Sequence, residues 1–419
     1  MEGRQNLFAT IADKLTSLRD QAAEKNPDQE LVYAAQVDYF ERAARAMERR
    51  EPIAWLNFGP APELFWAMDI VPIYVEGTMR TLTLASSEDI CRYIDLAEQH
   101  IPDYVCSADK ATFGAALAGD IPLPDMIVHS SHPCDSALAT FPPLAEYLGV
   151  PHFCIDMPYW SDERTFRYLE NELWDLVSFM EAKTKRKLDL ARLKQVAKYS
   201  SEAHEYILKY NELRQAIPCP LSGKDLLADR STFRRMAGTP ELVDYAKRRY
   251  ELAKEKVNAK QGAIAQEKIR LIWVFAMPSD PNLYDWLEET HGAVSIMEMM
   301  SNFAITPIED PSDISSIFRG LAGKTMNMPM GKECRGPWEY FGDVAVKMCR
   351  DYQPDAAVYA GHVACKNAWG ISKLVKDRIE DELNLPVLLF EVDIFDPRIT
   401  SLEGMKAKLN DFFEIRLHK

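Results

Sequence analysis

The fold is indicated by two similar stretches, PDMIVHSSHPC at Pro124–Cys134 and PDAAVYAGHVAC at Pro354–Cys365. Each begins with Pro-Asp, continues as a short apolar run, and ends at a cysteine shortly after a histidine. A helical pattern follows each cysteine, and then a Pro-led apolar run ends in an acid, Asp156 or Asp393. This order predicts two strand–loop–helix–strand units. In such units the strands are parallel, so each cysteine should lie at the carboxyl end of a strand, beside a helix N-terminus.

The same alternation extends outward from both stretches and defines the domains. Four apolar runs lie on either side of a charged helical middle: IAWLNF, VPIYVEG, DMIVHSS and VPHFCIDMP before it, and IRLIWVF, AVSIMEM, DAAVYAG and LPVLLFEVD after it. We therefore expect an α/β fold with two parallel-sheet domains. The predicted boundaries are residues 1–50 for an N-terminal helical arm, 51–160 for the first α/β domain, 161–268 for a helical domain and 269–419 for the second α/β domain.

Composition limits the class of protein. The chain has 419 residues and a formal net charge of −15, with no basic block to neutralise phosphates, which argues against nucleic-acid binding. No apolar run approaches the roughly 20 residues of a membrane span, and the N-terminus does not resemble a signal peptide. We expect a cytoplasmic protein that does not bind membranes. In that reducing compartment the eight cysteines are buried side chains or candidates for metal and redox chemistry.

Three cysteines stand out as loop residues: Cys106, Cys134 and Cys365. The chain has no CxxC pair, which disfavours zinc ribbons and ferredoxin-type binding. A helix N-terminus stabilises thiolate, the form that ligates metal. The three cysteines could therefore hold one metal centre assembled from separate loops. Two alternatives remain open, inert packing of individual cysteines and a cysteine nucleophile with His132 or His362 as its base.

The cysteine segments carry a resemblance to a known family. DYVCSADKATFG, LPDMIVHSSHPCDSALATFPPLAEYLGVPHFCIDMPY and PDAAVYAGHVACKNAWG, followed by LPVLLFEVDIFDPR, resemble the 2-hydroxyacyl-CoA dehydratases, benzoyl-CoA reductase subunits and double-cubane cluster proteins. The resemblance covers the chain from about Pro52 to its end. It implies two flavodoxin-like domains flanking a helical domain, with a 4Fe-4S type cluster between them ligated by Cys106, Cys134 and Cys365.

The resemblance also implies a partner that supplies electrons. Members of this family receive low-potential electrons from an ATP-hydrolysing activator that carries its own iron-sulfur cluster. This chain has neither GxxxxGK[ST] nor GxGxxG, so we expect ATP to be handled by such a partner. His132 and His362 are expected to lie near the cluster, where they could orient the cysteine loops or donate to cluster sulfur.

Two positions help to decide to which branch of the family the chain is most similar. The family's active-site glutamate is matched by Glu76 in IYVEG, which we expect to act as acid or base, although a structural role at a strand end is equally open. The family's substrate-binding serine corresponds to Phe58 in WLNFGPAPEL. Phenylalanine cannot hydrogen-bond a substrate oxygen, so this departure weakens the dehydratase interpretation.

The spare cysteines favour the double-cubane branch. Cys334, in MGKECRGPWEYFG, and Cys91, in SSEDICRYIDLAEQ, are the best candidates for the additional ligands of a double-cubane cluster. A buried helix face is an equally good explanation of Cys91. Cys349 is interpreted as a core residue, and Cys154 and Cys219 as structural residues, although either of these two could complete the ligand set.

Three functions follow from the sequence. The preferred one is a homodimeric iron-sulfur reductase that acts on small molecules at a double-cubane type cluster. The second is a subunit of a 2-hydroxyacyl-CoA dehydratase, a lyase, or of a benzoyl-CoA reductase, with a single 4Fe-4S cluster and a different partner chain. The third is a non-catalytic protein that stores electrons or serves cluster maturation.

Overall fold

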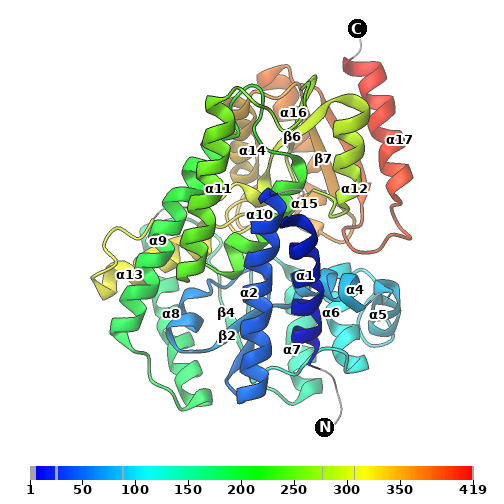
Figure 1. The fold of residues 1–419 in the computed structure, drawn as a ribbon. Coiled ribbons are helices and arrows are strands. Elements are labelled where there is room, and N and C mark those ends of the chain that lie inside the picture. Colours follow the sequence, from blue (N-terminus) through cyan, green and yellow to red (C-terminus); the bar gives the residue numbers. More distant parts are fainter. Residues whose placement is uncertain (1–5, 24–26, 87–88, 276, 306, 418–419) are drawn as a thin grey trace. The chain divides into compact units, whose positions relative to one another are not determined.

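The structure is a computed structural model that describes residues 6–23, 27–86, 89–275, 277–305 and 307–417 (Figure 1). The chain divides into two compact units. Unit 1 comprises Met1–Tyr206, Ser231–Lys247 and Ile305–Met328, and unit 2 comprises Ile207–Arg230, Arg248–Ala304 and Pro329–Lys419. The helical middle of the chain is shared between the two units.

Unit 1 is built around a four-stranded parallel sheet of order β2-β1-β3-β4. Its strands are β1 (Ile53–Leu56), β2 (Val71–Tyr74), β3 (Met126–Ser130) and β4 (His152–Ile155). The helices between the strands are α3 (Glu63–Ala67), α4 (Val75–Ser86), α5 (Ile90–Ala97), α6 (Ser107–Ala118) and α7 (Asp135–Leu148). The amphipathic N-terminal segment forms two helices that lie side by side, α1 (Leu7–Ala23) and α2 (Pro27–Arg49) (Figure 1).

Unit 2 has a second parallel sheet, of order β6-β5-β7-β8. Its strands are β5 (Ile269–Trp273), β6 (Ala293–Glu298), β7 (Ala356–His362) and β8 (Val387–Val392). Its helices are α12 (Pro281–Trp286), α14 (Trp338–Tyr352), α15 (Lys366–Gly370), α16 (Ser372–Leu383) and α17 (Leu402–Phe412). Helices α14 and α16 cover one face of this sheet, and α12 and α17 lie on the other (Figure 1).

The remaining helices join or cover these two sheets. They are α8 (Glu163–Thr184), α9 (Leu190–Leu213), α10 (Gly223–Arg235), α11 (Pro240–Asn258) and α13 (Ile314–Asn327), with short π- and 3-10 segments η1 (Leu287–His291), η2 (Met299–Ser301) and η3 (Phe413–Leu417). Stretches of α9, α10 and α11 belong to each unit. None of the helices in the described ranges is long and apolar enough to cross a bilayer.

The eight predicted strands are all present, and the two sheets have the same topology. If the strands of each unit are counted in chain order, both sheets run 2-1-3-4, the order of a flavodoxin-like fold without its last strand. Strands β1, β3, β5 and β7 are buried along their full length, as expected for parallel strands covered on both faces. The α/β fold with two parallel-sheet domains is thereby confirmed.

The repeated Pro-Asp has the same function in both sheets. Asp125 donates its backbone N–H to the Ile53 carbonyl at 2.8 Å, and its carboxylate accepts the Ile53 N–H at 2.8 Å. Asp355 makes the same two bonds with Arg270, at 2.9 and 2.8 Å. In each unit the aspartate thus fixes the start of the third strand against the first strand.

Candidate functional site

The three cysteines expected to hold a metal centre all occupy the same kind of position. Cys106 is the N-cap residue of α6, Cys134 that of α7, and Cys365 that of α15. All three are half-buried, and all eight cysteines of the chain are thiols rather than disulfides. The partial positive charge of a helix N-terminus favours thiolate over thiol, so each position suits a metal ligand.

Two of these cysteines lie where open α/β sheets bind ligands. The strand order reverses between β1 and β3 in unit 1, and between β5 and β7 in unit 2. Cys134 follows the carboxyl end of β3, and Cys365 follows the carboxyl end of β7. Such switch points are the usual ligand sites of doubly wound sheets. The position that the repeated stretches predict for both cysteines is the one observed.

In unit 1 the loops of Cys106 and Cys134 meet. The backbone N–H of Cys106 donates to the Ser136 hydroxyl at 2.9 Å, and Ser136 lies in the first turn of α7, two residues after Cys134. The N-termini of α6 and α7 are therefore adjacent, although 28 residues separate the two cysteines in sequence.

Cys91 lies apart from this pair. It occupies the first turn of α5, and α5 runs antiparallel to α6, because Tyr93 contacts Asp120 beyond the end of α6. Cys106 precedes the opposite end of α6. Along the axis of α6, roughly ten helical residues separate the position of Cys91 from that of Cys106, which is about 15 Å at the rise of an α-helix. The structure therefore does not bring Cys91 to the Cys106 and Cys134 loops.

In unit 2 the structure brings Cys334 close to Cys365. Cys334 is buried, and its pKa is raised well above the usual thiol value by burial and by the neighbouring Cys365 and Glu333. The pKa of Tyr359 is raised by burial and by the same two cysteines. The buried thiol of Cys334 and the half-buried N-cap residue Cys365 thus lie close together at the carboxyl end of β7.

The two expected histidines lie at equivalent strand ends but have different surroundings. His362, the last residue of β7, is buried, and its Nδ1 lies 3.8 Å from Asp393 Oδ2 beyond β8. His132 is half-buried, and its Nδ1 lies 3.3 Å from the Ser131 hydroxyl, which donates to Asp156 at 2.9 Å beyond β4. Each acid that ends a repeat thus lies next to the cysteine-bearing loop of its own sheet.

The other three cysteines have apolar or strand environments. Cys219 and Cys349 are buried in the core of unit 2, and burial raises the pKa of Cys349 to about 12. Cys154 lies in the edge strand β4, where burial and the acids Asp156 and Glu172 raise its pKa to about 11. None of these three cysteines is the N-cap residue of a helix, so they lack the feature that favours thiolate at Cys106, Cys134 and Cys365.

Glu76 lies in the first turn of α4, directly after β2, and is half-buried. Its pKa is raised well above the usual carboxyl value by burial and by the carboxyl of Asp109, while Arg234 and the Phe58 backbone lower it. Asp109 is a buried residue in the first turn of α6. Two carboxyl groups therefore face each other close to the α6 and α7 N-termini. Asp109 was not predicted from the sequence, because an acid in a first helical turn is common.

Unit 2 has a carboxylate at the corresponding strand end that was not predicted from the sequence either. Glu298 ends β6 and is fully buried. Arg230 donates to both of its oxygens at 2.9 Å, the Met277 N–H donates at 3.0 Å, and the Ser301 hydroxyl donates at 2.7 Å. This carboxylate is saturated with donors and has a structural role. The sequence signal for Glu298 is that the glutamate of AVSIMEM matches the glutamate of VPIYVEG, which is Glu76.

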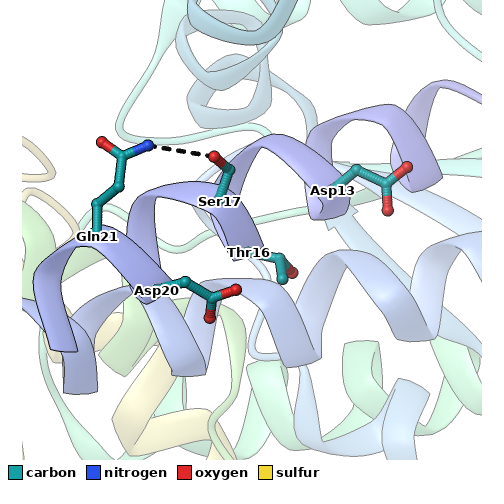
Figure 2. Close-up of a pocket in the computed structure, with 5 residues that line it drawn as sticks. All are labelled: Asp13, Thr16, Ser17, Asp20 and Gln21. Carbon is teal, nitrogen blue, oxygen red and sulfur yellow. Dashed lines mark hydrogen bonds between the residues drawn. The ribbon is translucent and has the colours of Figure 1, made fainter.

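No group of three or more His, Cys, Asp or Glu side chains close enough to hold a metal ion occurs among the described residues. A surface hollow of about 530 Å³ lies on α1, lined by Asp13, Thr16, Ser17, Asp20 and Gln21. Figure 2 shows these side chains on one helix, with Gln21 donating to Ser17 at 3.2 Å. The hollow on α1 includes none of the expected site residues.

Comparison with known proteins agrees with this arrangement. The model of the family described as 2-hydroxyglutaryl-CoA dehydratase, D-component, matches residues 59–415. The chain belongs to this family. The match spans strands β2 to β8 and all three N-cap cysteines, and it confirms the family resemblance of the cysteine segments.

Relatives of the chain are components of enzymes with several chains. The chain is 21% identical over 392 residues to the (R)-phenyllactyl-CoA dehydratase alpha subunit of Clostridium sporogenes, with 90% of this chain and 92% of the relative covered. It is 23% identical to lactoyl-CoA dehydratase subunit alpha of Anaerotignum propionicum, covering 89% and 92%. It is 20% identical to a benzoyl-CoA reductase subunit from Thauera aromatica, covering 78% and 77%. The family thus supplies components of both dehydratases and a reductase.

Proposed function

We propose that this chain is an iron-sulfur enzyme that reduces small molecules at low potential, with Cys106, Cys134 and Cys365 as cluster ligands. The observation that carries the proposal is the shared position of the three cysteines. Each is a half-buried helix N-cap, and two follow strands at the switch points of matching sheets. Two thiols alone would be compatible with packing, but three in this position on separate elements favour ligation.

The donors fit an iron-sulfur cluster. Iron in such clusters is held by thiolates, and a helix N-terminus favours that ionised form. When bound, the cluster would supply low-potential electrons for reduction. The chain's own contribution is to hold the sulfurs, and the fixed loops serve this purpose: Ser136 accepts the Cys106 N–H at 2.9 Å, and the Cys365 N–H donates to the His362 carbonyl at 2.9 Å.

A double-cubane cluster is favoured over a single cubane because of Cys334. A double cubane needs ligands beyond the three N-cap cysteines, and Cys334 supplies a further thiol beside Cys365. Burial raises the pKa of Cys334, and metal binding would offset this penalty by removing the proton. Cys91 remains a candidate with less support, since it lies at the far end of α6 from Cys106.

The alternative function is a subunit of a 2-hydroxyacyl-CoA dehydratase or benzoyl-CoA reductase with one 4Fe-4S cluster. It is favoured by the names of the relatives and by Glu76, whose raised pKa suits a proton donor. The side chain of Phe58 argues against it. The guanidinium of Arg234 lies 5.6 Å from the Phe58 ring centroid, so this position holds an aromatic–cation contact where the family has a hydroxyl.

Partners follow from the same proposal. An ATP-hydrolysing iron-sulfur activator would supply the electrons, because the sequence contains no phosphate-binding loop of its own. The preferred assembly is a cytoplasmic homodimer. The single-cubane alternative requires a different second chain, which should copurify with this one.

Anaerobic purification with iron and acid-labile sulfide analysis tests the cluster. About eight irons per chain would support a double cubane, and about four would support the single-cubane alternative. Serine substitution of Cys106, Cys134, Cys365 or Cys334 should lower the iron content. Cys154→Ser is the matched control, since Cys154 is a half-buried thiol in an edge strand, and it should retain all of its iron. Full iron content in the Cys106, Cys134 and Cys365 variants would refute the ligand assignment.

Activity and assembly separate the remaining possibilities. With an ATP-driven activator, reduction of acetylene or hydrazine would support the reductase, and dehydration of a 2-hydroxyacyl-CoA would support the alternative. A loaded cluster with neither activity would favour electron storage. Light scattering after size exclusion should give twice the 47.8 kDa chain mass for a homodimer.

A further inference from the structure

The side chain of Asp109 is a buried carboxyl with an unusual environment. Asp109 is 1% exposed, and neither of its oxygens has a hydrogen-bonding partner of good geometry among the described residues. The polar side chains that face it are Ser136 of α7 and Glu76 of α4. A serine hydroxyl does not titrate in the carboxyl range, which leaves the Glu76 carboxyl as the group with which Asp109 can share an acidic proton.

Glu76 is the more accessible member of this pair. It is half-buried, whereas Asp109 is almost fully buried. The Phe58 backbone and the Arg234 guanidinium face its carboxyl and lower its pKa. Phe58 lies just beyond β1, at the strand end where doubly wound sheets bind ligands.

We propose that Asp109 is a positioning residue for Glu76: the two carboxyl groups share one proton, and Glu76 presents that proton to the substrate. This inference deepens the proposed function and rests on it for the identity of the substrate. The sharing itself is a property of the folded chain. Burial and the second carboxyl together favour the protonated form of Glu76, so the site keeps a proton donor well above the ordinary carboxyl range.

Electrostatics supports a shared proton. Two carboxyl groups in contact inside a protein cannot both ionise without strong repulsion, so one proton is retained well above the usual carboxyl range. The charged groups that face the pair are Arg234, which favours ionisation of Glu76, and Asp135, which opposes ionisation of Asp109. One cation against three carboxylates leaves the singly protonated pair favoured.

The equivalent acid of unit 2 serves as an internal comparison. Glu298 accepts hydrogen bonds from Arg230, Met277 and Ser301, so its carboxylate is stabilised in the ionised form by fixed donors. Glu76 has one backbone donor and a second carboxyl instead. The difference assigns proton chemistry to the unit 1 site alone.

Carboxyl titration of the full chain tests this proposal. The side-chain carboxyl carbon of glutamate is labelled with ¹³C, and the Glu76 signal is assigned by its absence in Glu76→Gln. In the wild type this carboxyl should titrate well above the ordinary value of about 4.3. In Asp109→Asn its apparent pKa should fall by about one unit or more, because a neighbouring like charge is removed. A role of Asp109 in packing alone would leave this pKa unchanged.

Controls keep the result interpretable. Asp103→Asn removes an exposed acid near the start of α6 and should leave the Glu76 titration unchanged. If Asp109→Asn does not fold, Asp109→Ser tests the same coupling with a smaller uncharged side chain, and the Glu76 pKa should again fall. The proposal is overturned if Glu76 has an ordinary pKa in the wild type or the same raised pKa in Asp109→Asn. The titration needs no cluster, so its failure and a failed iron analysis are separate results.

Discussion

Replacement of Asp125 or Asp355 by alanine should destabilise the sheet to which each belongs. Each carboxylate accepts a backbone N–H at 2.8 Å from the start of an interior strand, at Ile53, the first residue of β1, or at Arg270, the second residue of β5. That N–H lies at the end of the strand ladder, so no neighbouring carbonyl replaces the lost acceptor. The same hydrogen bond occurs in both sheets, so the two substitutions test the same interaction twice.

The expected magnitude follows from the kind of bond. A hydrogen bond to a charged group contributes about 1.5–3 kcal/mol when well buried. Both aspartates are solvent-exposed, so water can partly compensate, and we expect a loss of about 1–1.5 kcal/mol of unfolding free energy per site. The two aspartates share no partner and belong to different units. The double variant should therefore lose about 2–3 kcal/mol, the sum of the single effects.

Urea denaturation followed by circular dichroism measures this effect. Asp351→Ala is the matched control in unit 2, because it removes an exposed acid whose 2.6 Å contact is an i,i+4 ion pair with Lys347. Such pairs contribute at most about 0.5 kcal/mol. If Asp125→Ala and Asp355→Ala change stability no more than this control, the repeated Pro-Asp does not fix the sheets and the structural reason for the repeat is wrong.

Two further predictions concern buried ionisable groups of unit 1. His129 and His204 are buried, and burial lowers the pKa of each to about 4, so protons are taken up on unfolding between pH 6.5 and 4. Unfolding free energy should therefore fall as the pH drops through this window, by about 2 kcal/mol per histidine at pH 5, and denaturation of His204→Asn should show a weaker dependence. Lys324 forms an ion pair with the fully buried Glu63, and both contact the Ser200 hydroxyl. Removing either charge alone should lower the unfolding free energy by about 3 kcal/mol, because the other charge is left buried without a partner. A double variant that removes both charges should recover part of this loss. Single effects below about 1 kcal/mol would contradict a buried ion pair here.

The sequence predicted the sheets and the cysteine positions because both follow from local rules. The apolar runs match buried parallel strands, and strand–helix–strand units can place Cys134 and Cys365 only at carboxyl ends of strands. The repeated aspartate was visible in the sequence, but its function was not. Its hydrogen bond reaches back 72 residues to Ile53, a pairing that strand order alone determines.

The environment of Cys91 could not be read from its spacing. The sequence places Cys91 on a helix before Cys106, which made a common site plausible. The structure pairs α5 and α6 so closely that a Cβ on Gly114 would lie 1.9 Å from the Tyr93 carbonyl oxygen. This close antiparallel contact, which requires glycine, directs the first turn of α5 away from the α6 N-terminus. Gly114 permits this close packing, and the antiparallel direction of α5 places Cys91 at the far end of α6 from Cys106.

The acids at the ends of β2 and β6 show why a repeat predicts a scaffold better than a function. Both sheets end their second strand near a glutamate, and nothing in either run of letters distinguishes the two. The difference lies in partners that are distant in sequence. Arg230, 68 residues before Glu298, donates to both oxygens of that carboxylate, whereas Glu76 faces the second carboxyl of Asp109. Donors stabilise an ionised carboxylate, and a second carboxyl retains a proton. The repeat therefore gives both sheets equivalent strand ends, and the side chains packed against each acid set its charge state: fixed donors favour ionised Glu298, whereas burial and Asp109 raise the pKa of Glu76.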